Sequence, residues 1–128
     1  MSGKCFAVWG LSFKPGTDDM REAASIVIIN ALIEKGAKIK AYDPKAMQEA
    51  EEHYFINQSN ISYCNDKYEA VDGADALVLI TEWKEFRSPD FERISALLNQ
   101  SIIFDGRNQY DKNMLKKYGY EYYQIGVK

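Results

Sequence analysis

The 128-residue sequence contains little of what several classes of protein depend on. It has two cysteines, one histidine and three prolines, too few for a disulfide scaffold, a histidine-rich metal site or a proline-rich linker. Hydrophobic residues make up 46% of the chain and charged residues 27%, which excludes disordered and collagen-like chains. Because the length is too short for two ordinary domains, we expect one compact domain with a real core.

Basic charge and long apolar segments are also scarce. The formal net charge is -3, which argues against a nucleic-acid scaffold because phosphate binding needs a basic face. The longest apolar run, residues 25–33, contains Asn30 and is shorter than the roughly 18 to 20 residues of a membrane helix. No signal-peptide pattern is present. We therefore expect a cytoplasmic protein that binds neither nucleic acid nor a membrane.

The cysteines and the histidine give no sign of a metal or disulfide site. Cys5 and Cys64 each lie within an apolar, strand-like run. Buried free thiols in a reducing compartment explain these positions better than a disulfide, which stays open as the alternative. His53 lies in a polar segment and is predicted to be a surface residue. Since no cysteine and histidine pair has the spacing of metal ligands, no metal site is expected.

Strand-like and helix-like segments alternate along the chain. Strands are predicted at residues 5–9, 38–42, 61–64, 76–81, 101–104 and 120–125, and helices at residues 20–35, 45–54, 66–71, 89–98 and 111–118. This alternation predicts an α/β fold, a Rossmann-like open and mostly parallel sheet of about six strands with helices on both faces. The expected strand order is 3-2-1-4-5-6, with a switch point between the first and fourth strands.

Three signals mark the ends of the predicted helices. Asp19 and Glu22 form a capping-box pattern at the start of the first helix, and Gly36 is placed to end it. That helix is apolar almost all round, so it should pack on the sheet and be partly covered by something else. The helix at 89–98 is predicted to begin through the pair Ser88 and Pro89.

Three loops follow the carboxyl ends of the strands, where open parallel sheets bind ligands: residues 10–19, 82–88 and 105–109. They and the first helical turn carry cationic and aromatic side chains: Lys14, Arg21, Lys84, Arg87 and Arg107, with Phe13, Trp83 and Phe86. Any one of these is readily explained as a surface side chain. Their convergence in an acidic protein instead favours an anionic ligand with a flat ring, such as a nucleotide diphosphate.

The loop at residues 10–19 lacks the G-x-G-x-x-G fingerprint of dinucleotide-binding turns. Gly10 is followed by Leu, Ser and Phe, and the next glycine is Gly16. Asp18 and Asp19 would repel phosphate from the helix N-terminus. We therefore predict that Lys14, rather than the helix terminus, meets the phosphates.

Two other functions that polar residues can indicate, a serine hydrolase and a receiver domain, have little support in this sequence. The serines lack the G-x-S-x-G elbow of hydrolases. Asp43 and Asp105 follow strands as the acidic residues of receiver domains do, but no acidic pair follows the first strand directly.

A series of motifs in order resembles the C-terminal, UDP-binding domain of the UDP-glucose/GDP-mannose dehydrogenases. The motifs are GLSFKPGTDDMREA (10–23), AYDP (41–44), ADALVLITEWKEFR (74–87), IIFDGRNQYD (102–111) and YQIG (123–126). The resemblance implies that residues 1–128 are a single UDP-binding domain of a longer dehydrogenase. Residues 1–3 are then candidates for an addition made for expression.

The resemblance implies ligand-binding roles at four positions. Phe13, Lys14 and Arg107 match residues that bind the substrate sugar nucleotide. Arg21 matches the arginine that reaches the NAD cofactor, which the family holds mainly in another domain.

Supporting roles are implied at three further positions. Asp18 and Asp19 match residues that position the arginine and cap the helix. Trp83 is expected to shape the pocket more than to contact the ligand.

The catalytic cysteine of the family has no counterpart here, since neither KCFAVWG nor SYCND resembles its glycine-rich motif. The resemblance implies oxidation of the sugar C6 hydroxyl to a carboxylate in two steps, through a thiohemiacetal and a thioester on that cysteine, with two NAD reduced. No catalytic residue is expected in this chain, which alone should be inactive.

Several alternatives stay open. UDP-glucose is favoured as the substrate over GDP-mannose or UDP-N-acetylmannosamine only by the residues of the TEW and FDGR motifs. A non-catalytic nucleotide-binding module with the same fold is a different class of function. The resemblance implies a parent that serves polysaccharide biosynthesis and forms a homodimer or larger assembly, whereas the chain by itself is expected to be a monomer.

Overall fold

The structure, a computed structural model, describes residues 3–12, 14, 16–17, 19–20, 24–56, 58–107 and 109–124. A six-stranded sheet with the order β3-β2-β1-β4-β5-β6 forms its centre. The strands are β1 (Cys5–Trp9), β2 (Lys38–Tyr42), β3 (Ile61–Tyr63), β4 (Ala76–Leu79), β5 (Ile102–Asp105) and β6 (Glu121–Gln124). All neighbouring strands pair in parallel. The predicted α/β class and strand order are confirmed.

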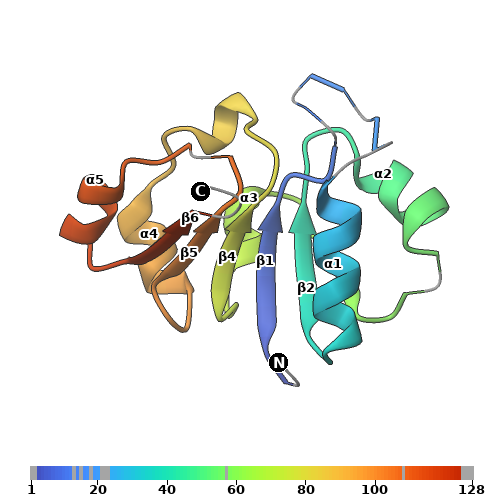
Figure 1. Cartoon of the computed structure of the whole chain (residues 1–128), viewed down its shortest axis with the longest axis horizontal. Coiled ribbons are helices and arrows are strands. Elements are labelled where there is room, and N and C mark those ends of the chain that lie inside the picture. The colour runs from blue at the N-terminus through green and yellow to red at the C-terminus, as the bar shows by residue number, and fades with distance from the viewer. Residues whose placement is uncertain are drawn as a thin grey trace.

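Helices lie on both faces of this sheet. They are α1 (Ala24–Glu34), α2 (Met47–Glu49), the π-helix η1 (Ala50–Tyr54), α3 (Lys67–Val71), the 3-10 helix η2 (Lys84–Phe86), α4 (Phe91–Leu97) and α5 (Lys112–Lys117). Figure 1 shows α1 in front of the sheet, with α3 and α4 behind it. The arrangement is the doubly wound one that alternating strands and helices predict.

The two faces of the sheet bury two separate cores. In β1, Phe6 and Val8 belong to the core on the α1 side, whereas Ala7 and Trp9 belong to the core on the α4 side. Side chains alternate in this way because successive residues of a strand point to opposite faces. Since β1 lies between β2 and β4, its carboxyl end is the switch point of the sheet.

Gly36 ends α1 as predicted. Its φ is 88° and its amide donates to the carbonyl of Ile33 at 2.9 Å, the left-handed cap that glycine adopts without steric cost. The described part of the helix begins at Ala24, and residues 21–23 lie outside the described residues, so the pairing of Asp19 with Glu22 stays a prediction. The outward side chain of Val27 is 72% exposed.

Two helix predictions need correction. Residues 45–54 do not form one α-helix, because the turn of α2 widens into η1, where the amide of Phe55 donates to the carbonyl of Ala50 at 2.8 Å. The helix α4 does not begin at Ser88 and Pro89 but after Asp90, whose carboxylate accepts from the amide of Arg93. An aspartate at the N-cap satisfies an amide that the first turn leaves unpaired.

Candidate functional site

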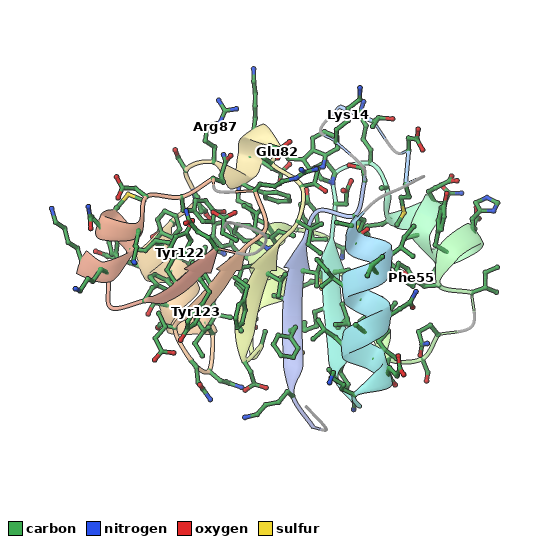
Figure 2. The ribbon with its side chains drawn as sticks, viewed as in Figure 1. Lys14, Phe55, Glu82, Arg87, Tyr122 and Tyr123 are labelled. Atoms are coloured by element: carbon green, nitrogen blue, oxygen red, sulfur yellow. The ribbon has the colours of Figure 1, made fainter. Side chains whose placement is uncertain are left out.

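The carboxyl ends of the strands carry the side chains that the sequence assigned to ligand binding. Figure 2 shows Lys14, Glu82 and Arg87 at this end of the molecule, while Tyr122 and Tyr123 lie along β6. Ligands of open parallel sheets bind at this edge, next to the switch point. The loops that follow β1, β4 and β5 therefore form the candidate site.

Asp43 connects two of these loops to the turn that follows β2. Its side chain is fully buried. Oδ2 accepts from the amide of Leu11 at 2.7 Å, from the amide of Ser12 at 3.1 Å and from the indole Nε1 of Trp83 at 3.1 Å. Oδ1 accepts from the amides of residues 45 and 46, each at 2.8 Å. A buried carboxylate needs such a set of donors to offset the loss of water.

Buried hydroxyl groups extend this network along the loop after β1. Thr81 Oγ1 donates to the carbonyl of Ser12 at 2.6 Å, and Ser25 Oγ donates to the carbonyl of Leu11 at 2.6 Å. Ser12 Oγ in turn donates to the carbonyl of Lys14 at 2.9 Å. Ser12, Ser25 and Thr81 are each at most 1% exposed. The backbone groups of Leu11 and Ser12 and the carbonyl of Lys14 are therefore held by hydrogen bonds.

Asp105 performs a similar task at the end of β5. It is fully buried, and Oδ1 accepts from the amide of Arg107 at 2.8 Å. Oδ2 accepts from the amides of Gln109 and Tyr110 and from the hydroxyl of Tyr122 at 2.7, 2.9 and 2.6 Å. Burial, followed by this hydrogen bond to Asp105, raises the pKa of Tyr122.

Arg107 lies where the loops after β4 and β5 meet. Its Nε donates to the carbonyl of Ile80 at 2.9 Å and lies 3.0 Å from Oε2 of Glu82. The side chains of Arg107 and Glu82 are 36% and 33% exposed, so solvent still reaches the pair. Glu82 was not singled out from the sequence, although the alternation of charge in TEWKEFR is a signal that could have drawn attention to it.

The loop after β4 corrects one prediction. Phe86 is not an apolar surface for a ligand, because it is fully buried and its ring stacks on that of Trp9 with centroids 4.9 Å apart. The carbonyl of Phe86 accepts from the hydroxyl of Tyr110 at 2.6 Å. The physical reason is that a bulky ring on a short 3-10 turn gains more from filling the core than from facing solvent. Phe86 is thus an anchor for the loop.

The structure describes some of the other residues predicted to bind the ligand and does not describe the rest. Lys14, Lys84 and Arg87 are exposed, and Asp19 and Trp83 are half-buried. The indole of Trp83 donates to Asp43, and its predicted role in shaping a pocket stays a prediction. Phe13, Asp18 and Arg21 lie outside the described residues, so their roles stay predictions.

The described site offers cations and anchored backbone. His53 lies on η1, outside these loops, and is exposed. Burial, with a smaller effect of the hydrogen bond to Glu85, raises the pKa of Tyr42 to about 12, too high for proton transfer near neutral pH. Cations on a rigid edge suit the binding of a phosphorylated ligand.

A depression lies elsewhere on the surface. Its volume is about 510 Å³ and it is lined by residues near the edge strand β3, among them Glu51, Phe55 and Tyr63. Its lining includes acidic side chains and no cationic one, which does not suit a phosphate. We therefore assign the candidate site to the loops at the carboxyl ends of the strands and not to this depression.

Comparison with known proteins agrees with this fold. Residues 7–112 match the model of the UDP-glucose/GDP-mannose dehydrogenase family, UDP binding domain. The UDP-glucose 6-dehydrogenase of Pseudomonas aeruginosa is 43% identical over 126 residues, which are 97% of this chain and 28% of that protein. The UDP-glucose 6-dehydrogenase of Rhizobium meliloti is 42% identical over 124 residues, again 97% of this chain and 28% of the relative.

Solved structures show the same architecture. The UDP-D-ManNAc dehydrogenase of Pyrococcus horikoshii has a TM-score of 0.75 and 28% identity, and the match covers 98% of this chain and 26% of that one. A UDP-glucose dehydrogenase from Pyrobaculum islandicum has a TM-score of 0.73 and 26% identity, with 97% of this chain and 25% of that one covered. This chain therefore spans about a quarter of the length of these four relatives.

Proposed function

The chain belongs to the UDP-glucose/GDP-mannose dehydrogenase family as its UDP binding domain, and from this premise we propose that it binds the sugar nucleotide in an NAD-dependent UDP-glucose 6-dehydrogenase. Such an enzyme oxidises UDP-glucose to UDP-glucuronate. The observation that supports the proposal is that Lys14 and Arg107 both follow carboxyl ends of strands at one edge of the sheet, on loops held by Asp43 and Asp105. The choice of UDP-glucose rests on the relatives at 43% and 42% identity.

Lys14 and Arg107 are assigned to the substrate. The ammonium of Lys14 would stabilise negative charge on the diphosphate, or on the sugar oxygen as hydride leaves. Arg107 would supply a planar guanidinium, which matches phosphate geometry better than an ammonium does. Phe13 would lie beside Lys14 against the substrate. Because the loops are anchored before any ligand arrives, less freedom is lost when the nucleotide binds.

The remaining residues are assigned supporting and cofactor roles. Arg21 would reach NAD, which supplies the hydride acceptor when it is bound. Asp18 and Asp19 would position Arg21, and Trp83 would shape the pocket through its bond to Asp43.

The nucleophilic cysteine of the proposed reaction is assigned to a part of the enzyme other than these residues. Cys5 begins β1, at the edge of the sheet opposite the site, and burial raises the pKa of its thiol. Burial raises the pKa of Cys64 to about 11. Protonated thiols are poor nucleophiles, which supports a structural role for both. As free thiols they also support the cytoplasm as the compartment of the enzyme.

A titration of the chain with UDP tests the proposal. NMR chemical shifts, which detect weak binding, would be followed with UDP, UDP-glucose and GDP-mannose. We expect weak but saturable binding of the uridine ligands, with the largest shifts in the loops after β1, β4 and β5. In Lys14→Ala the affinity for UDP should fall by about tenfold, as for the loss of one charged contact. Lys38→Ala removes the same charge at the opposite edge of the sheet and should change affinity by less than about twofold.

Different results would replace the proposal. Preference for GDP-mannose over UDP and UDP-glucose would point to a sister dehydrogenase, and UDP-N-acetylmannosamine added as a fourth ligand would identify the other sister enzyme if it bound more tightly than UDP-glucose. Tight binding by the chain alone, with no oxidation of any sugar nucleotide by the whole protein, would indicate a non-catalytic module. An unchanged affinity for both UDP and UDP-glucose in Lys14→Ala would remove Lys14 from the substrate site.

A further inference from the structure

The carboxylate of Asp43 makes more hydrogen bonds than the turn around it requires. Oδ1 alone accepts the amides of Lys45 and Ala46 and so closes the turn after β2. An asparagine would satisfy that arrangement equally well, since its single carbonyl oxygen can accept both amides. The second oxygen of Asp43 serves a different purpose.

Oδ2 joins the two loops that flank the switch point. It accepts from the amides of Leu11 and Ser12, in the loop after β1, and from the indole of Trp83, in the loop after β4. All three partners are N–H donors. An asparagine that kept the turn would present its NH₂ group to these donors, so only a carboxylate can close the turn and join the loops at once.

The connection continues from Asp43 to the predicted ligand contacts. Ser12, held through its amide by Asp43, donates its hydroxyl to the carbonyl of Lys14. The carbonyl of Ser12 accepts from Thr81, which directly precedes the partner of Arg107, Glu82. A chain of buried hydrogen bonds thus runs from the loop of Lys14 to the loop that positions Arg107. Such bonds are strong in a low-dielectric interior and costly to leave unmade.

We infer that Asp43 is a positioning residue, which locks the loop of Lys14 to the loop of Trp83 so that the site has its binding geometry before the nucleotide arrives. The inference rests on the proposed function for its ligand. Its structural part, the locking of the two loops, stands on the hydrogen bonds alone. Asp43 has no contact with substrate in this scheme and acts through Ser12 and Trp83.

The direct test of the lock is hydrogen exchange in Asp43→Asn. We expect the amides of Leu11 and Ser12 and the indole N–H of Trp83 to exchange at least about tenfold faster, as for the loss of a charge-assisted hydrogen bond. The amide of Ala46 should stay protected, because asparagine keeps the turn. The indole of Trp9, which donates to the carbonyl of Lys67, is an internal reference. Faster exchange at all five groups in equal proportion would indicate a general loss of stability and overturn the inference.

The functional test is the affinity for UDP. In Asp43→Asn it should fall by about tenfold or more. Asp66→Asn is the matched control, because Asp66 caps α3 through Oδ1 alone, by accepting the amides of Tyr68 and Glu69. It should change UDP affinity by less than about twofold. Unchanged UDP affinity in a folded Asp43→Asn would overturn the inference.

Two further measurements distinguish a failure of the proposed function from a failure of the positioning role of Asp43. If the unsubstituted chain does not bind UDP, the proposed function fails, and the exchange pattern then decides the positioning role by itself. If Asp43→Asn does not fold, Trp83→Phe replaces it, since this change keeps an aromatic ring and removes the indole donor. A several-fold loss of UDP affinity in Trp83→Phe supports the lock, and an unchanged affinity overturns it.

Discussion

The Nε atom of Arg107 lies between two acceptors, 2.9 Å from the carbonyl oxygen of Ile80 and 3.0 Å from Oε2 of Glu82. The carbonyl is fixed by the end of β4, whereas the carboxylate belongs to a loop side chain. Glu82 therefore both orients Arg107 and offsets part of its positive charge. A phosphate that approaches Arg107 is attracted by its guanidinium and repelled by the carboxylate of Glu82.

Removing the charge of Glu82 should favour an anionic ligand. In Glu82→Gln the side-chain oxygen remains as an acceptor for Arg107, while the negative charge is lost. We expect UDP affinity to rise by about two- to fivefold at low ionic strength, the range of an exposed charge pair, and the gain to shrink as salt is added. Titrations at two salt concentrations measure this. Glu121→Gln, at the start of β6 and the opposite edge, should have no such effect, and weaker binding in Glu82→Gln would mean that its charge is needed in the site.

Replacing Phe86 should destabilise the whole domain rather than only the site. The ring is fully buried and stacks on Trp9, so Phe86→Ala should lower the free energy of unfolding by about 3 to 5 kcal/mol. Urea denaturation gives this value. Val27→Ala, at a side chain that is 72% exposed, should cost less than about 0.5 kcal/mol. Similar costs for the two changes would contradict the buried position of Phe86.

Gly10 should be far less replaceable than another glycine with a similar backbone angle. Its φ is +98°, and an added Cβ would lie 2.5 Å from the backbone nitrogen of Thr81. Gly119 has φ +85° but no atom within 4 Å of an added Cβ. Gly119→Ala should therefore cost about 1 to 2 kcal/mol for the left-handed angle alone. Gly10→Ala should cost more than about 4 kcal/mol or prevent folding. Thermal unfolding of both variants tests the difference, and equal melting temperatures would refute the close approach to Thr81.

Alkaline pH should weaken the fold through its buried tyrosines. Burial raises the pKa of Tyr42 and of Tyr63 to about 12 from the ordinary value of 10.0. It raises the pKa of Tyr110 and Tyr120 as well. Because these pKa values are higher in the folded state, their contribution to stability is complete below pH 10 and is lost as the pH rises through 12.

Phenolate absorbance and circular dichroism, recorded together, measure this effect. Tyr42, Tyr63, Tyr110 and Tyr120 should ionise only above pH 10, together with the loss of helix signal. Ionisation of these four side chains near pH 10 in a chain that keeps its circular dichroism would show that their phenols are not buried.

The positions of the strands were predictable because their signals are local, and the strand order then followed from the rule for doubly wound sheets. A strand such as β4 shows itself as a run of apolar residues, and Asp43 and Asp105 mark the ends of β2 and β5. Glycine at residue 36 marked the end of α1 for the same reason. Each of these signals depends on neighbours in the sequence, so no knowledge of distant contacts was needed.

The form of η1 was not predictable in this way. The polar, weakly amphipathic pattern of residues 45–54 indicates an ordinary helix, yet the chain adopts the wider turn in which Phe55 donates to Ala50. Both residues are buried, Phe55 at 5% exposure. We attribute the wider turn to the packing of Phe55 against the sheet, a tertiary contact that overrides the local preference for a regular helix.

The sequence by itself determined the strands and helices, because hydrophobic periodicity and turn residues act over a few positions, and the alternation of these elements implied the α/β architecture, the strand order and the three loops at the switch point. Only the tertiary structure decided that Phe86 fills the core and that Asp43 binds both flanking loops. These contacts join residues far apart in the chain, 69 positions for Thr81 and Ser12 and 40 for Trp83 and Asp43. No local pattern specifies such partners, since they are selected when the folded sheet brings its loops to one edge.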